Sequence, residues 1–536
     1  MMQFMSRRLA KNLFMFCQAA EAGVKSIGII YYLIIAIFLT WVFGPSLAVG
    51  YLYHDDYLIT QVTSTGSCVN HPQYLYYLVD VFRPGAIAIK CIIGVLSPKI
   101  EQLVFFKYVS LTLCFVILVL FFNEARKLVP NQFWALALTL FLSVLPSYQQ
   151  PILNLANSTH LIAWLLSFSA GVVFVNYCQS AVLRISYILS FCLTLLFLYC
   201  ATATYPMSSF AFFIPICVQL LRSKSIFEIA KLASLATAII SAVFATYLIT
   251  KSLAFNSFSY LLNNPTNVNP SLDLSSIVNF YINASPSWYL AIFNYQPLEA
   301  QFVHGIVWMF CALVLIFIFM SVFKTDSWRI AALRLTKILV VSAVLLFSLF
   351  PVAVTGYFLL FRLFIVFHAM LILFVGYVVT NVVVDIQLLC QEMSKLFFLK
   401  KVVAALKTPL RALVCFCLLV FGANWQQSIL HEVAIPNWVE YQKVLKAVKH
   451  QLNQHESIHV ITGQRSDKAQ SPDEFYLLTS HFPQDVELIV NRAFKSEQKQ
   501  RPPALQVTNG PTANIATWPK TKNINPSTAL IIDLTN

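Results

Sequence analysis

Residues 27–57 read IGIIYYLIIAIFLTWVFGPSLAVGYLYHDDY and decide the class of this fold. The run from Ile27 to Leu47 is almost wholly apolar, and about 20 such residues cross the hydrocarbon core of a bilayer. This run is too long for the apolar part of a signal peptide and has no cleavage site, so it predicts a retained membrane anchor. The chain then becomes polar at His54-Asp55-Asp56-Tyr57, where two carboxylates are adjacent.

Composition extends this interpretation to the whole chain. Of its 536 residues, 58% are hydrophobic and only 11% are charged, and the mean hydropathy is +0.72. A soluble protein carries about 25% charged residues, so the sequence predicts a polytopic membrane protein. The net charge is +14, but Lys and Arg in membrane proteins mainly report orientation. No basic run is interleaved with exposed aromatics, so we expect no nucleic-acid partner.

Apolar runs predict about eleven membrane spans. They lie near 27–47, 103–122, 133–149, 159–177, 185–203, 206–221, 232–253, 301–323, 335–355, 357–380 and 409–424. With the N-terminus inside, the inner segments carry Arg126, Lys127, Arg184, Arg222, Lys224, Lys231, Lys324, Arg329, Arg334, Lys337, Lys395, Lys400, Lys401, Lys407 and Arg411. The outer loops 146–158, 204–205 and 256–300 carry no Lys or Arg. This asymmetry predicts a cytoplasmic N-terminus and an exported C-terminal tail.

Residues 75–97 are nearly long enough to span, but counting them would place Arg126 and Lys127 outside. We therefore expect this segment to lie in the outer interface as an amphipathic helix that holds Asp80, Arg83 and Lys90.

The chain divides into a membrane domain, residues 1–424, and a small exported α/β domain, residues 425–536. The first exported loop is 48–102 and the long one is 255–300. The aromatics of the long loop, Trp288 among them, are able to stack on sugar faces or to form an interfacial belt. In the tail, Trp438, Tyr441, Leu445, Val448 and Leu452 repeat at helical spacing, and β-rich runs follow at 458–461, 486–490 and 529–532.

The 12 cysteines show no CxxC or zinc spacing and mostly lie in apolar runs, where they are expected to be small core residues. Cys68 and Cys91 fall in the same exported loop, so they are able to pair. The sequence leaves the pairing open.

The acid pair is the first candidate for chemistry. Only 12 of the 22 acidic residues precede residue 425, and two of them are Asp55 and Asp56. Neighbouring side chains point in different directions, so one carboxylate can be a general base while the other orients a partner or binds a metal. The alternative is a solvated helix cap or turn.

Three cations are the next candidates. Arg83, Lys90 and Arg362 lie on the outer side, where they suit a phosphate group, and Arg can bind two of its oxygens. The alternatives are snorkelling to lipid head groups for Arg83 and Lys90, and a structural partner for Arg362.

Two uncharged candidates are weaker. Tyr205 can line a pocket at the outer turn before Pro206. His54 can be a ligand or a second base, or a bystander. We expect the lone residues His160 and His368 to be structural.

Four places in this order carry a family resemblance: His54-Asp55-Asp56-Tyr57, Phe82-Arg83-Pro84, Tyr205, and Arg362 with its span. The set resembles the GT-C superfamily of integral-membrane glycosyltransferases, which use polyprenyl-phosphate sugars. More closely, it is similar to the serotype-converting O-antigen glucosyltransferases of the family II type. The chain departs from that pattern after the acid pair, at Phe82, where the family often has Gly, and at Pro206.

The resemblance implies a GT-C-like α-helical fold in the bacterial inner membrane, with the tail in the periplasm. It implies inverting transfer of a hexose, with glucose favoured, from undecaprenyl phosphate to lipopolysaccharide O-antigen. Asp55 or Asp56 would be the base, Arg83, Arg362 and Lys90 would bind the donor phosphate, and His54, Tyr57, Tyr205 and Trp288 would contact substrate. A divalent cation (Mg or Mn) stays open.

Two alternatives remain. The first is a GT-C transferase of another sugar or acceptor, such as protein or lipid A. The second is a polyprenyl-lipid flippase or transporter, which would more often show internal repeats and midplane charges.

Overall fold

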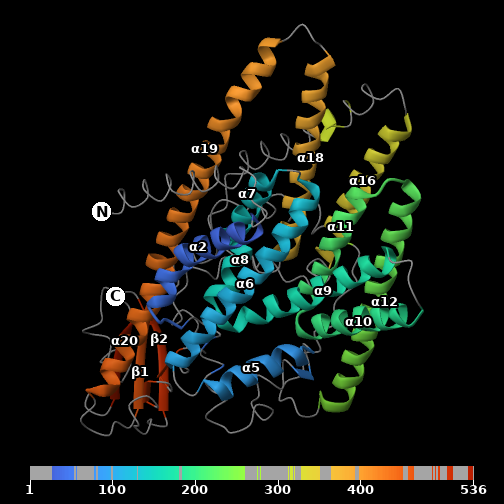
Figure 1. Ribbon diagram of the computed structural model, residues 1–536. Coiled ribbons are helices and arrows are strands. Elements are labelled where there is room, and N and C mark those ends of the chain that lie inside the picture. Colours follow the sequence, from blue (N-terminus) through green and yellow to red (C-terminus); the bar gives the residue numbers. More distant parts are fainter. Residues whose placement is uncertain are drawn as a thin grey trace.

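The computed structural model describes residues 27–52, 56, 59, 78–79, 82–97, 100–129, 131–179, 184–259, 275, 278, 312, 314–317, 319, 328–350, 364–392, 397–450, 457–463, 486, 489–490, 493–494, 504–510 and 529–534. Figure 1 shows their arrangement.

Seven helices of the described chain contain a stretch long and apolar enough to cross a membrane. They are α2 (Ile27–Ala48), α6 (Ile100–Leu128), α9 (Ser158–Gln179), α12 (Ile226–Phe258), α16 (Trp328–Phe347), α18 (Ile365–Glu392) and α19 (Phe397–Ser428). Each covers much of one of the predicted apolar runs. The prediction of an α-helical polytopic membrane protein is confirmed.

The remaining predicted spans are broken or short. Helices α7 (Gln132–Ser143) and α8 (Pro146–Leu153) meet at a bend of 57°, where Pro146 begins the second helix. The α10 helix (Arg184–Thr204) and the pair η2 (Ser208–Phe212) and α11 (Phe213–Arg222) include shorter apolar segments. The predicted span 301–323 lies mostly outside the described residues, so the total of eleven stays a prediction.

Helix α5 (Pro84–Leu96) lies within the segment expected at the interface. Its 13 residues extend about 20 Å, which is less than the roughly 30 Å of a bilayer core. Its first turn packs against the last turn of α10: a Cβ at Gly85 would overlap Thr204 Oγ1 and lie 3.0 Å from Thr204 Cα. Only glycine allows this approach.

The molecule has two chemically different ends. Helices α6 and α11 finish in basic residues (Arg126, Lys127 and Arg222), and we call this the basic end. Helices α18 and α19 extend beyond the bundle at the top of Figure 1, away from α5. The opposite end, which we call the loop end, carries α5, Tyr51 and Tyr205. Residues on the two ends of α12 are therefore separated by the thickness of the bundle.

The C-terminal tail packs at the loop end. Helix α19 passes through a π-helical turn (Ile429–Ala434) into α20 (Ile435–Lys449). Strands β1 (Ser457–Gly463), β2 (Ala504–Gly510) and β3 (Ala529–Leu534) form a parallel sheet in the order β2-β1-β3. One buried cluster joins this tail to the first loop: Tyr441, Val444, Val448, Ile458, Val460 and Ile532 pack with Leu52, Ile59, Ile93, Leu103 and Leu155. The tail and the first loop thus share one end of the molecule.

The expected strand at 486–490 is wrong. Val486, Ile489 and Val490 are helical and buried. With Ala493 and Phe494 they follow the i, i+3, i+4, i+7, i+8 spacing of an amphipathic helix, so the apolar run had been assigned the wrong period. Strand β2 was not predicted because its sequence, ALQVTNG, has few strand-forming residues.

Candidate functional site

Two predicted site residues that are far apart in sequence meet at the loop end. Arg83 precedes α5, and Tyr205 follows α10. The guanidinium carbon of Arg83 lies 4.4 Å from the centre of the Tyr205 ring, within cation–π range. The Nε atom of Arg83 is buried and has no hydrogen-bond partner among the described residues. Among the described residues, no carboxylate forms an ion pair with Arg83.

A strained residue holds Arg83 in position. The φ angle of Phe82 is 53°, a left-handed conformation that a bulky residue rarely adopts. The Tyr247 hydroxyl donates to the Phe82 carbonyl at 2.8 Å, and the two rings pack 5.6 Å apart. Such strain costs about 1–3 kcal/mol and persists where surrounding contacts over-determine it. Position 82 is also where the resembled family often has Gly, which adopts this conformation without that cost.

His160 joins the same cluster. Its ring centre lies 3.3 Å from that of Tyr205, and its Nδ1 lies 3.4 Å from the Ser208 hydroxyl. It is the third residue of α9, so the cluster sits at the partially positive end of a 22-residue helix. Asn157 Nδ2 and Ser158 Oγ are buried there without a partner among the described residues. Arg83 and the first turn of α9 both contact Tyr205, and a cation close to a helix N-terminus suits an anion.

Lys90 lies two turns along α5 from Arg83. Arg83 is the N-cap of α5 and is not itself helical, whereas Lys90 lies within the helix.

Asp56 of the acid pair lies in a buried ion pair. Its Oδ2 is 3.0 Å from Lys107 Nζ, and the two side chains are 0% and 1% exposed. Lys107 also donates to the Tyr51 carbonyl at 3.0 Å and lies 3.7 Å from the centre of its ring. Asp56 is thus fixed by a cation and shielded from solvent.

Tyr51 completes this buried cluster. Burial, and then the Asp56 charge, raise the pKa of the Tyr51 phenol well above its ordinary value. The phenol therefore stays protonated, and it donates to the Leu153 carbonyl at 3.3 Å.

Several predicted site residues lie outside the described part of the chain: His54, Asp55, Tyr57, Trp288 and Arg362. Cys91 is disulfide-bonded, and Cys68 is the cysteine that the sequence places in the same loop. Within the described residues, no three His, Cys, Asp or Glu side chains gather as a metal site would need.

The sequence prediction missed Lys107 and gave His160 only a structural role. Lys107 stands inside the apolar run 103–122, and a charge within a predicted span is itself a signal of a buried partner. Nothing in the sequence places His160 beside Tyr205, because helix packing decides that contact. No family model matches this chain, and no curated protein matches it either.

Proposed function

We propose that this protein is a membrane-embedded glycosyltransferase that moves a hexose from undecaprenyl phosphate to O-antigen. The family that the sequence resembles favours glucose as the hexose. The Arg83–Tyr205 stack beside His160 is the observation that carries this proposal. It presents a cation that has no ion-pair partner in the described chain, at the end of the molecule that holds the first loop. The single phosphate of a polyprenyl-linked sugar suits such a cation.

In this proposal the acid pair has divided roles. Lys107 neutralises Asp56 and excludes it from solvent, so Asp56 anchors the loop. We assign removal of the proton from the acceptor hydroxyl to Asp55, because adjacent side chains generally point in different directions and the two acids need not share one task. The acceptor oxygen attacks the anomeric carbon, the bond from that carbon to the phosphate oxygen breaks, and the configuration inverts.

The leaving phosphate gains negative charge as the bond breaks. Arg83, Arg362 and Lys90 would stabilise it, which is electrostatic catalysis by preorganised cations. No proton donor is needed because a phosphate monoester leaves as an anion. His54, Tyr57, Tyr205 and Trp288 would contact the sugar and acceptor. A divalent cation, Mg or Mn, would help at the acid pair if one binds there.

The orientation belongs to the same proposal. The predicted eleven spans would put the N-terminus in the cytoplasm and the α/β tail in the periplasm of a bacterial inner membrane. The tail shares a buried cluster with the first loop, and the Cys91 disulfide is typical of an oxidising compartment. Both observations support a periplasmic loop end.

The test uses purified protein in detergent with undecaprenyl-phosphate-[¹⁴C]glucose and O-antigen acceptor. We expect label on the acceptor and release of undecaprenyl phosphate, with both products formed roughly 100-fold or more slowly by Arg83→Ala. Detergent removes the two leaflets, so a flippase would give no product. Donor movement across proteoliposomes without transfer would instead establish a transporter. Transfer to protein or lipid A alone would correct the acceptor.

A further inference from the structure

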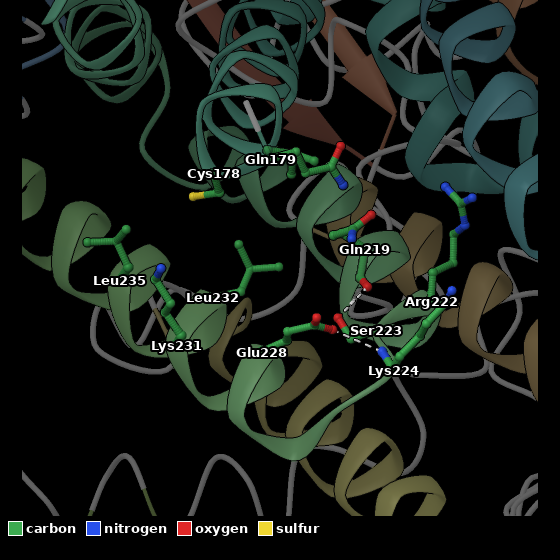
Figure 2. A pocket seen from close by; sticks show the side chains of 11 residues that line it. Cys178, Gln179, Gln219, Arg222, Ser223, Lys224, Glu228, Lys231, Leu232 and Leu235 are labelled. Atoms are coloured by element: carbon green, nitrogen blue, oxygen red, sulfur yellow. Dashed lines mark hydrogen bonds between the residues drawn. The ribbon is translucent and has the colours of Figure 1, made fainter. Parts of the chain in front are cut away.

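The basic end contains a cavity of about 620 Å³ that the proposed reaction does not use. It lies between the last turns of α9 and α11 and the first turns of α12 (Figure 2). Cavities of roughly 300–1,000 Å³ are typical of small-molecule sites. Glu228 lies in the first turn of α12, and Tyr247, which bonds to Phe82, lies 19 residues or about 28 Å further along the same helix. This cavity is therefore distinct from the Arg83 cluster.

Cations dominate the polar lining. Arg222, Lys224 and Lys231 line the cavity, are exposed, and form no ion pair among the described residues. Figure 2 shows Arg222 and Lys224 on one side and Lys231 on the other. The start of α12 adds the positive end of a 33-residue helix.

Glu228 is the carboxylate that lines the cavity, and it already accepts a hydrogen bond from the backbone. Glu228 Oε2 accepts from the Lys224 backbone N–H at 3.0 Å, and the Glu228 N–H donates to Ser225 Oγ at 3.2 Å. These two bonds resemble a capping box, with the Glu228 carboxylate reaching back to the residue before the Ser225 N-cap. Glu228 is thus oriented toward the backbone by the cap.

A smaller cavity of about 70 Å³ adjoins and shares Arg222. Its acid, Glu124, is bound by Lys127 at 2.5 Å. The two cavities together therefore hold more cations than carboxylates.

The lining also includes the apolar side chains of Val175, Leu232 and Leu235, beside the polar Gln179 and Gln219. Cations close to apolar side chains fit a ligand with an anionic head and an acyl chain. We propose that this cavity binds a phosphate group at the inner side of the membrane, and that the phosphate belongs to an anionic phospholipid such as phosphatidylglycerol.

The first test uses two cysteines of the native chain. Cys178 lines the cavity and is exposed, whereas Cys192 is exposed on α10 outside it. Detergent-purified protein is labelled with a maleimide, with and without phosphatidylglycerol, and both sites are quantified by peptide mass spectrometry. We expect phosphatidylglycerol to slow labelling of Cys178 and to leave Cys192 unchanged. Equal protection by diacylglycerol, which has no phosphate, would overturn the proposal.

The second test removes charge. Native mass spectrometry compares phosphatidylglycerol binding to Arg222→Gln/Lys231→Gln and to a control, Arg126→Gln/Arg329→Gln, which loses two exposed cations outside the cavity. We expect the first variant to bind at least about tenfold more weakly and the control to bind like wild type. Equal losses would show general attraction to the basic end and would refute a site.

A third arm identifies the source of the phosphate. Glycerol 3-phosphate and inorganic phosphate replace the lipid in both measurements. Protection of Cys178 by these soluble anions, without protection by the lipid, would keep the phosphate chemistry but refute the lipid. Failure of the cavity proposal leaves the transferase assay unaffected, because that assay reports on the other end of the molecule.

Discussion

Two cations at the loop end differ in whether a carboxylate balances their charge. Lys107 is fully buried against Asp56, and its charge is balanced. Arg83 is half-buried against the Tyr205 ring, with no carboxylate beside it in the described chain. A buried balanced pair fixes structure, because separating its charges is costly, whereas a held cation without a counter-ion is available to an anionic ligand. The comparison separates the residue that anchors the loop from the residue that would meet the donor.

The largest expected effect divides the acid pair itself. Asp55→Asn should lower turnover roughly 100- to 10,000-fold, because the amide cannot accept the acceptor proton. Because the described ion pair of Lys107 is with Asp56, we expect the thermal stability and donor binding of Asp55→Asn to match wild type. Asp56→Asn should instead lower the unfolding temperature, because the carboxylate that balances Lys107 is gone. Turnover, fluorescence-detected unfolding and donor binding measured on both variants check this.

If Asp56→Asn abolishes turnover while Asp55→Asn is fully active, the two roles are reversed. If the double Asn variant transfers at the wild-type rate, the acid pair is only a feature of the turn.

Lys107→Met tests the balanced cation. Removal of one partner leaves Asp56 buried and uncompensated, which typically costs about 3–5 kcal/mol of folding free energy. Adding Asp56→Asn in the same chain should restore much of that loss. Lys446→Met, an exposed lysine of α20, is the matched control and should change stability by no more than about 0.5 kcal/mol. Unfolding of detergent-purified protein measures all three, and a neutral Lys107→Met would mean that the pair does not form.

Arg83→Ala tests the unbalanced cation. We expect turnover to fall roughly 100-fold or more, since one lost transition-state donor costs about 3–4 kcal/mol. Stability should change little, because no balanced pair is broken. Arg83→Lys should recover only part of the rate, because an ammonium cannot reproduce the two-oxygen geometry or the planar contact with Tyr205. A folded, fully active Arg83→Ala would make Arg83 a lipid-facing anchor.

These two cations also show what the sequence could predict. The apolar runs predicted the spanning helices, because about 20 apolar residues have few other stable placements. Arg83 and Tyr205 were proposed from their positions on the outer side and then from a resemblance, but their contact depends on the docking of α5 against α10, which no local pattern encodes. Lys107 was missed because one charge hardly alters the hydropathy of its run. Residues 486–490 were misassigned because short apolar runs fit both periods.

The smallest expected effect concerns how Arg83 is positioned. Gly85 brings the first turn of α5 against Thr204, and an added Cβ would overlap Thr204 Oγ1. Gly85→Ala should therefore push α5 away, at a cost of about 1–3 kcal/mol for overpacking. Arg83 would move with the helix, and a displacement of about 1 Å can cost up to about 100-fold in rate. The loss of turnover should exceed the loss expected from the fraction of protein that unfolds. The ion pair between Lys107 and Asp56 should stay intact.

Gly28→Ala is the control, because a Cβ there meets nothing within 4 Å. It should match wild type in both turnover and unfolding. Gly85→Ala/Thr204→Ala removes the overlapping hydroxyl and should regain part of the lost rate, although the Thr204 backbone still lies close. If Gly85→Ala is as active and as stable as wild type, α5 does not dock on α10 through this contact. The Arg83–Tyr205 stack would then need another explanation than helix docking.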